Sequence, residues 1–127
     1  MNGMELSPEE AAILEEINGL IEAEEWDEAE ARINEVQEQM QGPLAGTRLY
    51  ILRGLMLKGK NEEDRAGRCF MTAFSIVRFA PPTEPAIQLV LGEAAELAGE
   101  TGEALDAYQR VLEAEPENMV AKAALER

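Results

Sequence analysis

The sequence offers few side chains that could carry out chemistry. Cys69 is its single cysteine, and it contains no histidine. A cysteine nucleophile reacts as the thiolate, which needs a neighbouring base or cation to form. Because Cys69 stands beside Phe70 on an expected apolar helical face, we interpret it as a small buried hydrophobic residue. A single cysteine also excludes an intrachain disulfide, so nothing indicates an oxidising compartment.

Carboxylates are densest over residues 22–30. A calcium-binding loop needs oxygen ligands at alternating positions and a central glycine, and this segment has neither. We interpret Asp27, Glu28 and Glu30 as the first turn and solvated face of a helix, because carboxylates there interact favourably with the helix dipole. Gly99 and Gly102 follow no strand pattern and predict no phosphate-binding loop. Without a coherent catalytic or ligand set, we predict a protein that is not an enzyme and holds no metal or cofactor.

The charge is strongly negative and unevenly distributed. The formal net charge is −15, divided as −12 over residues 1–43, +4 over 44–83 and −7 over 84–127. A negative balance opposes binding to nucleic-acid phosphates and to anionic membrane surfaces. The chain has neither a secretory signal pattern nor an apolar run of the roughly 20 residues that span a bilayer. We therefore expect a single domain over 1–127, located in the cytoplasm.

The basic middle of the chain is its most informative surface, and it comprises Arg48, Arg53, Lys58, Lys60, Arg65, Arg68 and Arg78. In one interpretation these cations pair with the acidic segments on either side, at about 0–1 kcal/mol per surface pair. In the other they form a positive stripe for an acidic segment of a partner or for an acidic face of a second copy. The sequence leaves both interpretations open.

Periodic apolar residues and breakers predict six helices in three pairs, followed by a short seventh. Ser7, Pro8 and Glu10 form a capping-box helix start. The second helix is expected from Trp26 through Met40, with a stop at Gly42-Pro43, and the third over about 45–58. Asn61 is expected to cap the fourth, Pro81-Pro82 to end it, and residues 83–85 to open a fifth through Leu97. A sixth follows the turn at 99–102, and Asn118 is expected to cap the last.

The helix pairs repeat one another. Ala29, Ala66 and Ala104 are separated by 37 and 38 residues, and the same steps separate Ile33, Phe70 and Tyr108. A constant period of this length with two helices per unit is typical of an α-solenoid. We expect Gly54 and Gly92, at equivalent positions of the preceding helices, to be points of close helix contact.

The third unit carries a recognisable motif, Leu91-Gly92-x2-Ala95-x3-Gly99-x4-Ala104-x3-Tyr108-x2-Val111-x4-Pro116. It resembles the tetratricopeptide repeat (TPR) family, with Ala95 in place of the usual aromatic residue; the first two units are degenerate. The resemblance implies an all-α fold, a right-handed α-solenoid of three helix pairs over about 8–43, 45–81 and 84–117. A C-terminal solvating helix over 118–126 would complete it.

In that family the first helix of each pair lines a concave groove that binds a peptide or a segment of a partner protein. The resemblance therefore implies partner-binding positions at Ala11, Leu14, Asn18, Ile21, Arg48, Ile51, Leu52, Leu55, Lys58, Ala86, Leu89, Val90 and Glu93. Such a groove is an apolar trough with a basic centre, in which apolar anchors give affinity and charges give register. We predict a protein-interaction module or adaptor.

A well-known variant of the family clamps a C-terminal carboxylate with lysine, arginine and asparagine side chains. Here the five equivalent positions hold Leu14, Asn18, Leu52, Ala86 and Val90, and only Asn18 agrees. We therefore expect no binding of the acidic tails of the large cytosolic chaperones.

Two alternatives remain open at the level of sequence. The chain is similar in size, charge and three-repeat organisation to the TPR chaperones of bacterial type III secretion, which keep apolar segments of a secreted partner soluble. The second alternative is self-assembly into a homo-oligomer, in which Leu49, Phe74, Phe79 and Met119 would form the interface.

Overall fold

The computed structural model describes residues 5–79 and 84–126 and is all-helical. Over these ranges it contains no strand, and its helices are α1 (Pro8–Glu22), α2 (Trp26–Val36), α3 (Pro43–Gly59), α4 (Glu63–Val77), α5 (Pro85–Leu97), α6 (Thr101–Ala114) and α7 (Met119–Glu126). None of the described helices is long and apolar enough to cross a membrane.

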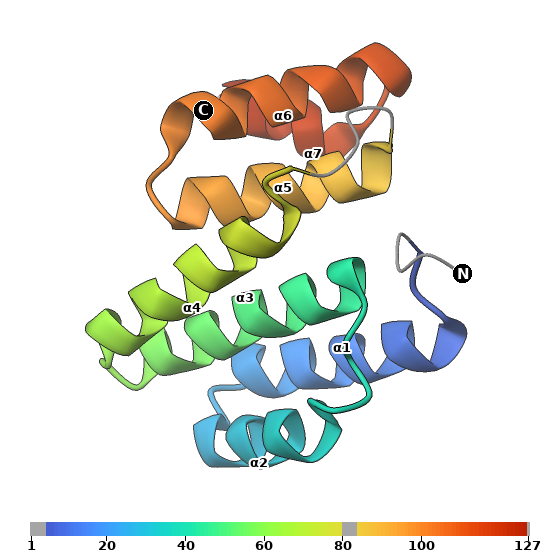
Figure 1. Cartoon of the computed structure of the whole chain (residues 1–127). Coiled ribbons are helices and arrows are strands. Elements are labelled where there is room, and N and C mark those ends of the chain that lie inside the picture. Colours follow the sequence, from blue (N-terminus) through green and yellow to red (C-terminus); the bar gives the residue numbers. More distant parts are fainter. Residues whose placement is uncertain (1–4, 80–83, 127) are drawn as a thin grey trace.

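The helices pair in chain order (Figure 1). Helix α1 packs on α2, α3 on α4 and α5 on α6, and α7 lies against α6. The first helices of the three pairs also lie side by side, since α3 contacts both α1 and α5. Each pair contacts the next through a second surface as well, α2 on α3 and α4 on α5. The predicted all-α fold with paired helices is therefore confirmed.

The same turn joins the two helices of every pair. Glu24, Asn61 and Gly99 each adopt a positive φ, of 59°, 66° and 85°. The amide of the next residue donates to the carbonyl five residues earlier, at 2.8–2.9 Å in all three turns. This is the hydrogen bond of a Schellman C-cap. The prediction that Asn61 caps the following helix is wrong, because its left-handed backbone closes the preceding one. The cap residue of α4 is Glu62, which makes no side-chain capping bond.

Other predicted boundaries are confirmed or shifted. Ser7 and Glu10 form the capping box, with bonds of 2.8 and 3.1 Å, and Asn118 accepts from the amide of Ala121 at 3.0 Å. Helix α2 ends at Val36 rather than reaching Met40, whose side chain is nevertheless buried. Helix α3 begins at its first-turn proline, two residues earlier than expected. The expected stop at residues 81–82 lies outside the described residues.

Close packing of glycine against an aromatic ring marks the seam inside two pairs. A Cβ atom on Gly54 would lie 2.4 Å from Cε1 of Phe70, and one on Gly92 would lie 2.7 Å from Cε1 of Tyr108. Real Cβ atoms do not approach other atoms so closely, so only glycine fits. In the first pair the corresponding glycine position holds Ile17, which is fully buried. The predicted close contacts at Gly54 and Gly92 are therefore confirmed.

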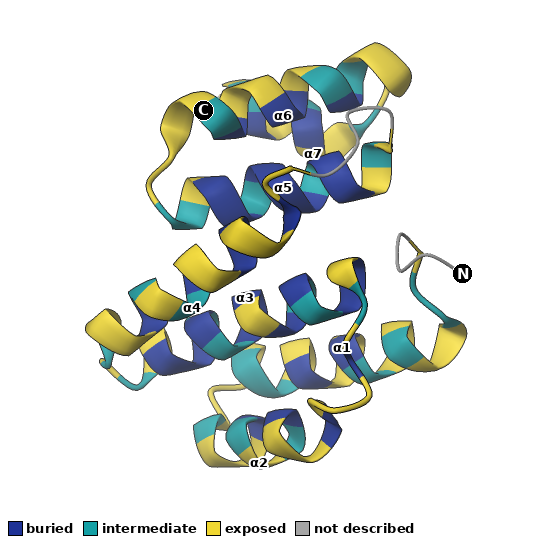
Figure 2. Ribbon diagram, in the orientation of Figure 1, coloured by how far each residue is buried: buried dark blue, intermediate teal, exposed yellow. Residues whose placement is uncertain are grey.

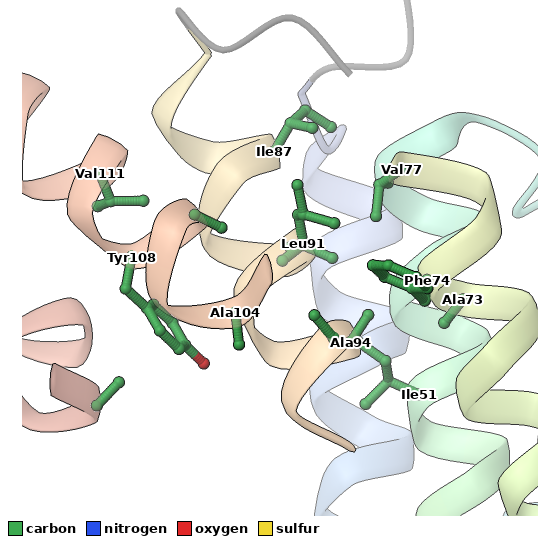
Figure 3. Close-up of a cluster of buried hydrophobic side chains, with 14 of the residues drawn as sticks. Ile51, Ala73, Phe74, Val77, Ile87, Leu91, Ala94, Ala104, Tyr108 and Val111 are labelled. Carbon is green, nitrogen blue, oxygen red and sulfur yellow. The ribbon is translucent and has the colours of Figure 1, made fainter. Parts of the chain in front are cut away.

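The core divides into two clusters that meet on the second pair. The N-terminal cluster comprises Leu14, Ile17, Ala29, Ile33, Val36, Met40, Ala45, Leu49, Leu52, Met56, Leu57, Ala66 and Phe70. The C-terminal cluster comprises Leu44, Ile51, Ala73, Phe74, Val77, Ile87, Val90, Leu91, Ala94, Ala95, Ala104, Ala107, Tyr108, Val111, Ala121 and Ala124 (Figure 3). Helix α3 contributes to both, and its buried residues recur almost all round the helix (Figure 2).

This burial removes part of the expected self-assembly surface. Leu49 and Phe74 are 5% and 2% exposed, because each faces one of the two clusters, so neither is available for an interface. Phe79 and Met119 are 88% and 75% exposed and remain on the surface.

Candidate interaction groove

A groove of about 430 Å³ lies between α1, α3 and α5. Its lining comes from these three helices and from the residue before the N-cap of α1. It consists of Leu6, Ala11, Leu14, Glu15, Asn18, Leu44, Arg48, Leu52, Ala86, Leu89 and Val90. The lining is mostly aliphatic. On each helix every lining residue has another lining residue three or four positions away, which places them on one face.

The structure brings eight of the thirteen sequence-predicted positions into this lining, namely Ala11, Leu14, Asn18, Arg48, Leu52, Ala86, Leu89 and Val90. Three of these form a floor, since Leu14, Leu52 and Val90 are 2–6% exposed. Leu89 is partly buried, and Ala11, Asn18 and Ala86 are exposed. A molecule in the groove would therefore touch side chains from α1, α3 and α5.

The other five predicted positions lie outside the lining. Ile51 is buried in the C-terminal cluster with Phe74 and Ala94 (Figure 3), because its side of α3 is covered by α4 and α5. Ile51 therefore lies in the core and outside the lining of the groove. Lys58 is exposed in the last turn of α3, at the opposite end of the helix from the groove.

The remaining three predicted positions, Ile21, Leu55 and Glu93, also lie outside the lining. Ile21 and Leu55 are partly buried and pack against the core clusters. Glu93 lies one turn beyond the lining on α5 and reaches the groove indirectly, through Arg48.

Sequence reasoning missed three lining residues. Leu44 precedes Arg48 by four positions on one helical face, but α3 was expected to begin after it. Glu15 follows Ala11 by the same interval, so the spacing on α1 could have identified it. Leu6 lies before the helix start, where helical periodicity gives no signal. Its only signal is an apolar residue directly before a capping serine.

One ion pair crosses from the second pair to the third beside the groove. Nη1 of Arg48 lies 3.6 Å from Oε1 of Glu93. Burial raises the pKa of Glu93, the Arg48 guanidinium acts in the opposite direction, and Glu96 raises it further. Burial outweighs the attraction, so Arg48 only partly compensates the Glu93 carboxylate.

Three of the seven cations in the basic middle, Arg48, Lys60 and Arg78, pair with acidic groups of the flanking units within the described residues. Lys60 Nζ lies 3.3 Å from a Glu30 oxygen and 3.7 Å from an Asp27 oxygen, and Arg78 Nη2 lies 3.1 Å from Glu103. The bond to Glu30 is the main cause that raises the pKa of Lys60. These contacts favour the intramolecular interpretation of the basic middle.

The remaining cations of the basic middle differ among themselves. Arg53 donates to Gln37 at 2.8 Å and to Asn34 at 3.3 Å, so it too joins the first two pairs. Arg65 pairs with Glu62 one turn earlier on its own segment. Lys58 and Arg68 are exposed and have no ion-pair partner among the described residues.

Cys69 is half-buried on α4. Burial raises the pKa of its thiol, and the opposing effect of Arg53, Arg65 and Arg68 is smaller. A raised pKa keeps the thiol protonated, which is unfavourable for a nucleophile.

Comparisons of the chain with family models, with curated proteins and with solved structures find no match in any of the three.

Proposed function

We propose that the chain is a TPR-like right-handed solenoid that binds a segment of a partner protein in the groove between α1, α3 and α5. The observation that carries this proposal is the lining itself. Aliphatic side chains from three helices converge on a space of about 430 Å³, and an arginine stands among them. Apolar grooves of this kind hold extended or helical segments through a few aliphatic anchors.

Three further features support the solenoid. The turns at Glu24, Asn61 and Gly99 repeat with the sequence period of 37 and 38 residues. The glycine–aromatic seam recurs with the same offset at Gly54 and Gly92. Helix α7 buries Ala121 and Ala124 against the last pair and exposes Met119 and Val120. That arrangement suits a terminal helix that covers the end of a repeat array.

A role without catalysis in the cytoplasm is part of the proposal. Cys69 has a raised thiol pKa. The carboxylates of Asp27 and Glu30 contact Lys60, which gives them a structural role. An aliphatic groove suits two kinds of partner. One is a short peptide segment, and the other is an aggregation-prone protein of the kind that secretion chaperones hold.

The test is a pull-down from source cells with the tagged chain, followed by titration of the purified partner that mass spectrometry identifies. Leu89→Arg places a charge in the groove, and we expect it to weaken binding at least tenfold. Leu105→Arg is the matched control, because Leu105 is 42% exposed on α6, away from the lining. Equal loss of binding in both variants, or in neither, would contradict the groove as the binding site.

A charge-matched pair of variants tests the role of Arg48. Arg48→Glu places a second carboxylate beside that of Glu93. This variant is expected to weaken binding of an acidic partner. Lys58→Glu makes the same charge change at the far end of α3 and is expected to leave binding unchanged. One-to-one co-purification with a single aggregation-prone protein would favour the chaperone; weak binding of many short peptides would favour the adaptor.

A further inference from the structure

One side chain in the lining of the groove belongs to none of the three groove helices. Leu6 precedes α1, yet it lies in the lining with Leu89 and Val90 of α5 and Leu52 of α3. It is partly buried and packs against both core clusters. In Figure 1 residues 5–7 run from the start of α1 in the direction of α5.

A hydrophobic staple alone does not account for this position. In a staple, the residue before the cap packs on the fourth residue of its own helix, which here is Ala11. Leu6 does line the groove together with Ala11. It also packs against the C-terminal cluster, however, and no residue of α1 belongs to that cluster. The contact with the distant helices is therefore additional to the staple.

We propose that Leu6 is a tethered occupant of the groove, and that a partner segment places an aliphatic side chain where Leu6 now lies. The proposal rests on the function proposed above, because it names the kind of anchor that the groove accepts. The groove has an open space of about 430 Å³ beside Leu6, so a partner must displace Leu6 only to place a side chain at its position. The apparent affinity of that contact falls by the fraction of molecules in which Leu6 has left this position.

The local structure makes this displacement possible without unfolding α1. The capping box begins at Ser7, whose amide and hydroxyl bond with Glu10. Leu6 lies outside the box and outside the helical hydrogen bonds. Its side chain can leave the groove while the helix start remains intact.

The test uses the chain's own anchor in trans. The probe is a fluorescein-labelled synthetic peptide of residues 1–10, titrated against the full chain and followed by anisotropy and by NMR up to millimolar concentration. Leu6→Ala removes the tethered side chain, and we expect this variant to bind the peptide about tenfold more tightly than the unmodified chain. A probe peptide in which the leucine is alanine is expected to lose this binding.

Three variants serve as controls. Leu6→Met keeps an aliphatic occupant and is expected to bind the peptide as weakly as the unmodified chain. Ile13→Ala removes a comparable, partly buried side chain that packs on the N-terminal cluster alone and lies outside the lining, so it is expected to leave peptide binding unchanged. Leu6→Ala combined with Leu89→Arg is expected to abolish binding, and circular dichroism verifies that each variant folds.

The outcomes separate this proposal from the proposed function. If the peptide binds the unmodified chain and Leu6→Ala equally, or binds neither, the proposal that Leu6 is a tethered occupant is wrong. This holds even if Leu89→Arg releases the cellular partner. If the peptide behaves as expected but Leu89→Arg leaves the cellular partner bound, the proposed function is wrong and the occupant stands. A dimer that Leu6→Ala converts to monomer would place Leu6 of a second copy in the groove and overturn the tether within one chain.

Discussion

The ring of Phe70 fills the space that a side chain at Gly54 would need, because its Cε1 atom lies only 2.4 Å from the point that a Cβ would occupy. Phe70 is 5% exposed, so the ring has little room to move away. Gly54→Ala is therefore expected to lower the free energy of unfolding by about 1–3 kcal/mol. Urea unfolding followed by circular dichroism measures the change.

Gly67 provides the matched control, since it lies inside α4 and a Cβ there meets no atom within 4 Å. Gly67→Ala is expected to stabilise by roughly 0.5–1 kcal/mol, because alanine is the better helix former. Adding Phe70→Leu to Gly54→Ala is expected to recover part of the loss. A stabilising Gly54→Ala would show that the two helices can separate freely at this point.

The positive φ of Glu24 predicts a stabilising substitution. A non-glycine residue in this region costs about 1–2 kcal/mol, and glycine avoids that cost. Glu24→Gly is thus expected to raise the melting temperature, whereas Gly99→Ala, with a φ of 85°, is expected to lower it. Glu24→Gln removes the charge but keeps the strain, so it isolates the backbone effect. Equal gains from Gln and Gly would assign the effect to charge.

The hydroxyl of Thr47 is fully buried on α3, and its Oγ1 atom has no hydrogen-bond partner among the described residues. Valine has almost the same shape and no polar group, so Thr47→Val is expected to stabilise by about 1 kcal/mol. Ser75→Ala is the control, because its exposed hydroxyl bonds to the carbonyl of Met71 and its loss is expected to change stability by less than about 0.5 kcal/mol. A destabilised Thr47→Val would indicate a bonded hydroxyl.

The single tryptophan reports on the contact between the first and second pairs. A Cβ on Gly59 would lie 2.4 Å from Cη2 of Trp26, so Gly59→Ala must push the indole outward. We expect its fluorescence emission to shift to longer wavelength as water reaches the ring. Gly67→Ala is expected to leave the emission maximum unchanged. An unshifted spectrum for Gly59→Ala would mean that the indole already lies away from α3.

Glu93 gives a pH dependence with a defined sign. Because its pKa is raised by burial, the folded chain binds this proton more tightly than the unfolded chain does. Its favourable contribution is complete below the ordinary glutamate pKa of about 4.3 and is lost as pH rises through the folded value. The stability of the unmodified chain relative to Glu93→Gln is therefore expected to fall as the pH rises above the ordinary glutamate pKa. A pH-independent difference would contradict the raised pKa.

Much of the fold could be predicted because its determinants are local or periodic. The capping box at Ser7 and the Asn118 cap depend on neighbours three residues away. The close contacts at Gly54 and Gly92 follow from a repeated interval along the chain. The Asn61 prediction failed because asparagine suits both a helix start and a left-handed helix end. The equivalent turns at Glu24 and Gly99 show that Asn61 ends a helix. The sequence alone does not reveal this equivalence, because the three turn positions share no residue type.

The groove was predicted less completely because its lining depends on packing between distant helices. Ile51 and Leu52 are adjacent in sequence, yet one is covered by α4 and α5 while the other forms part of the floor. Helix α3 is apolar almost all round, so its periodicity cannot separate core from groove. Leu6 belongs to no helix, and its contacts with α5 follow from the three-dimensional arrangement alone.

The sharing of α3 between both core clusters has a consequence for cooperativity. Fraying of the first pair would expose one side of α3 while the other stays packed, and fraying of the last pair would do the reverse. The amide protons of α3 are thus protected by whichever terminal pair remains. Under native conditions they would exchange with deuterium most slowly of all, so the central helix would be the last part of the chain to open.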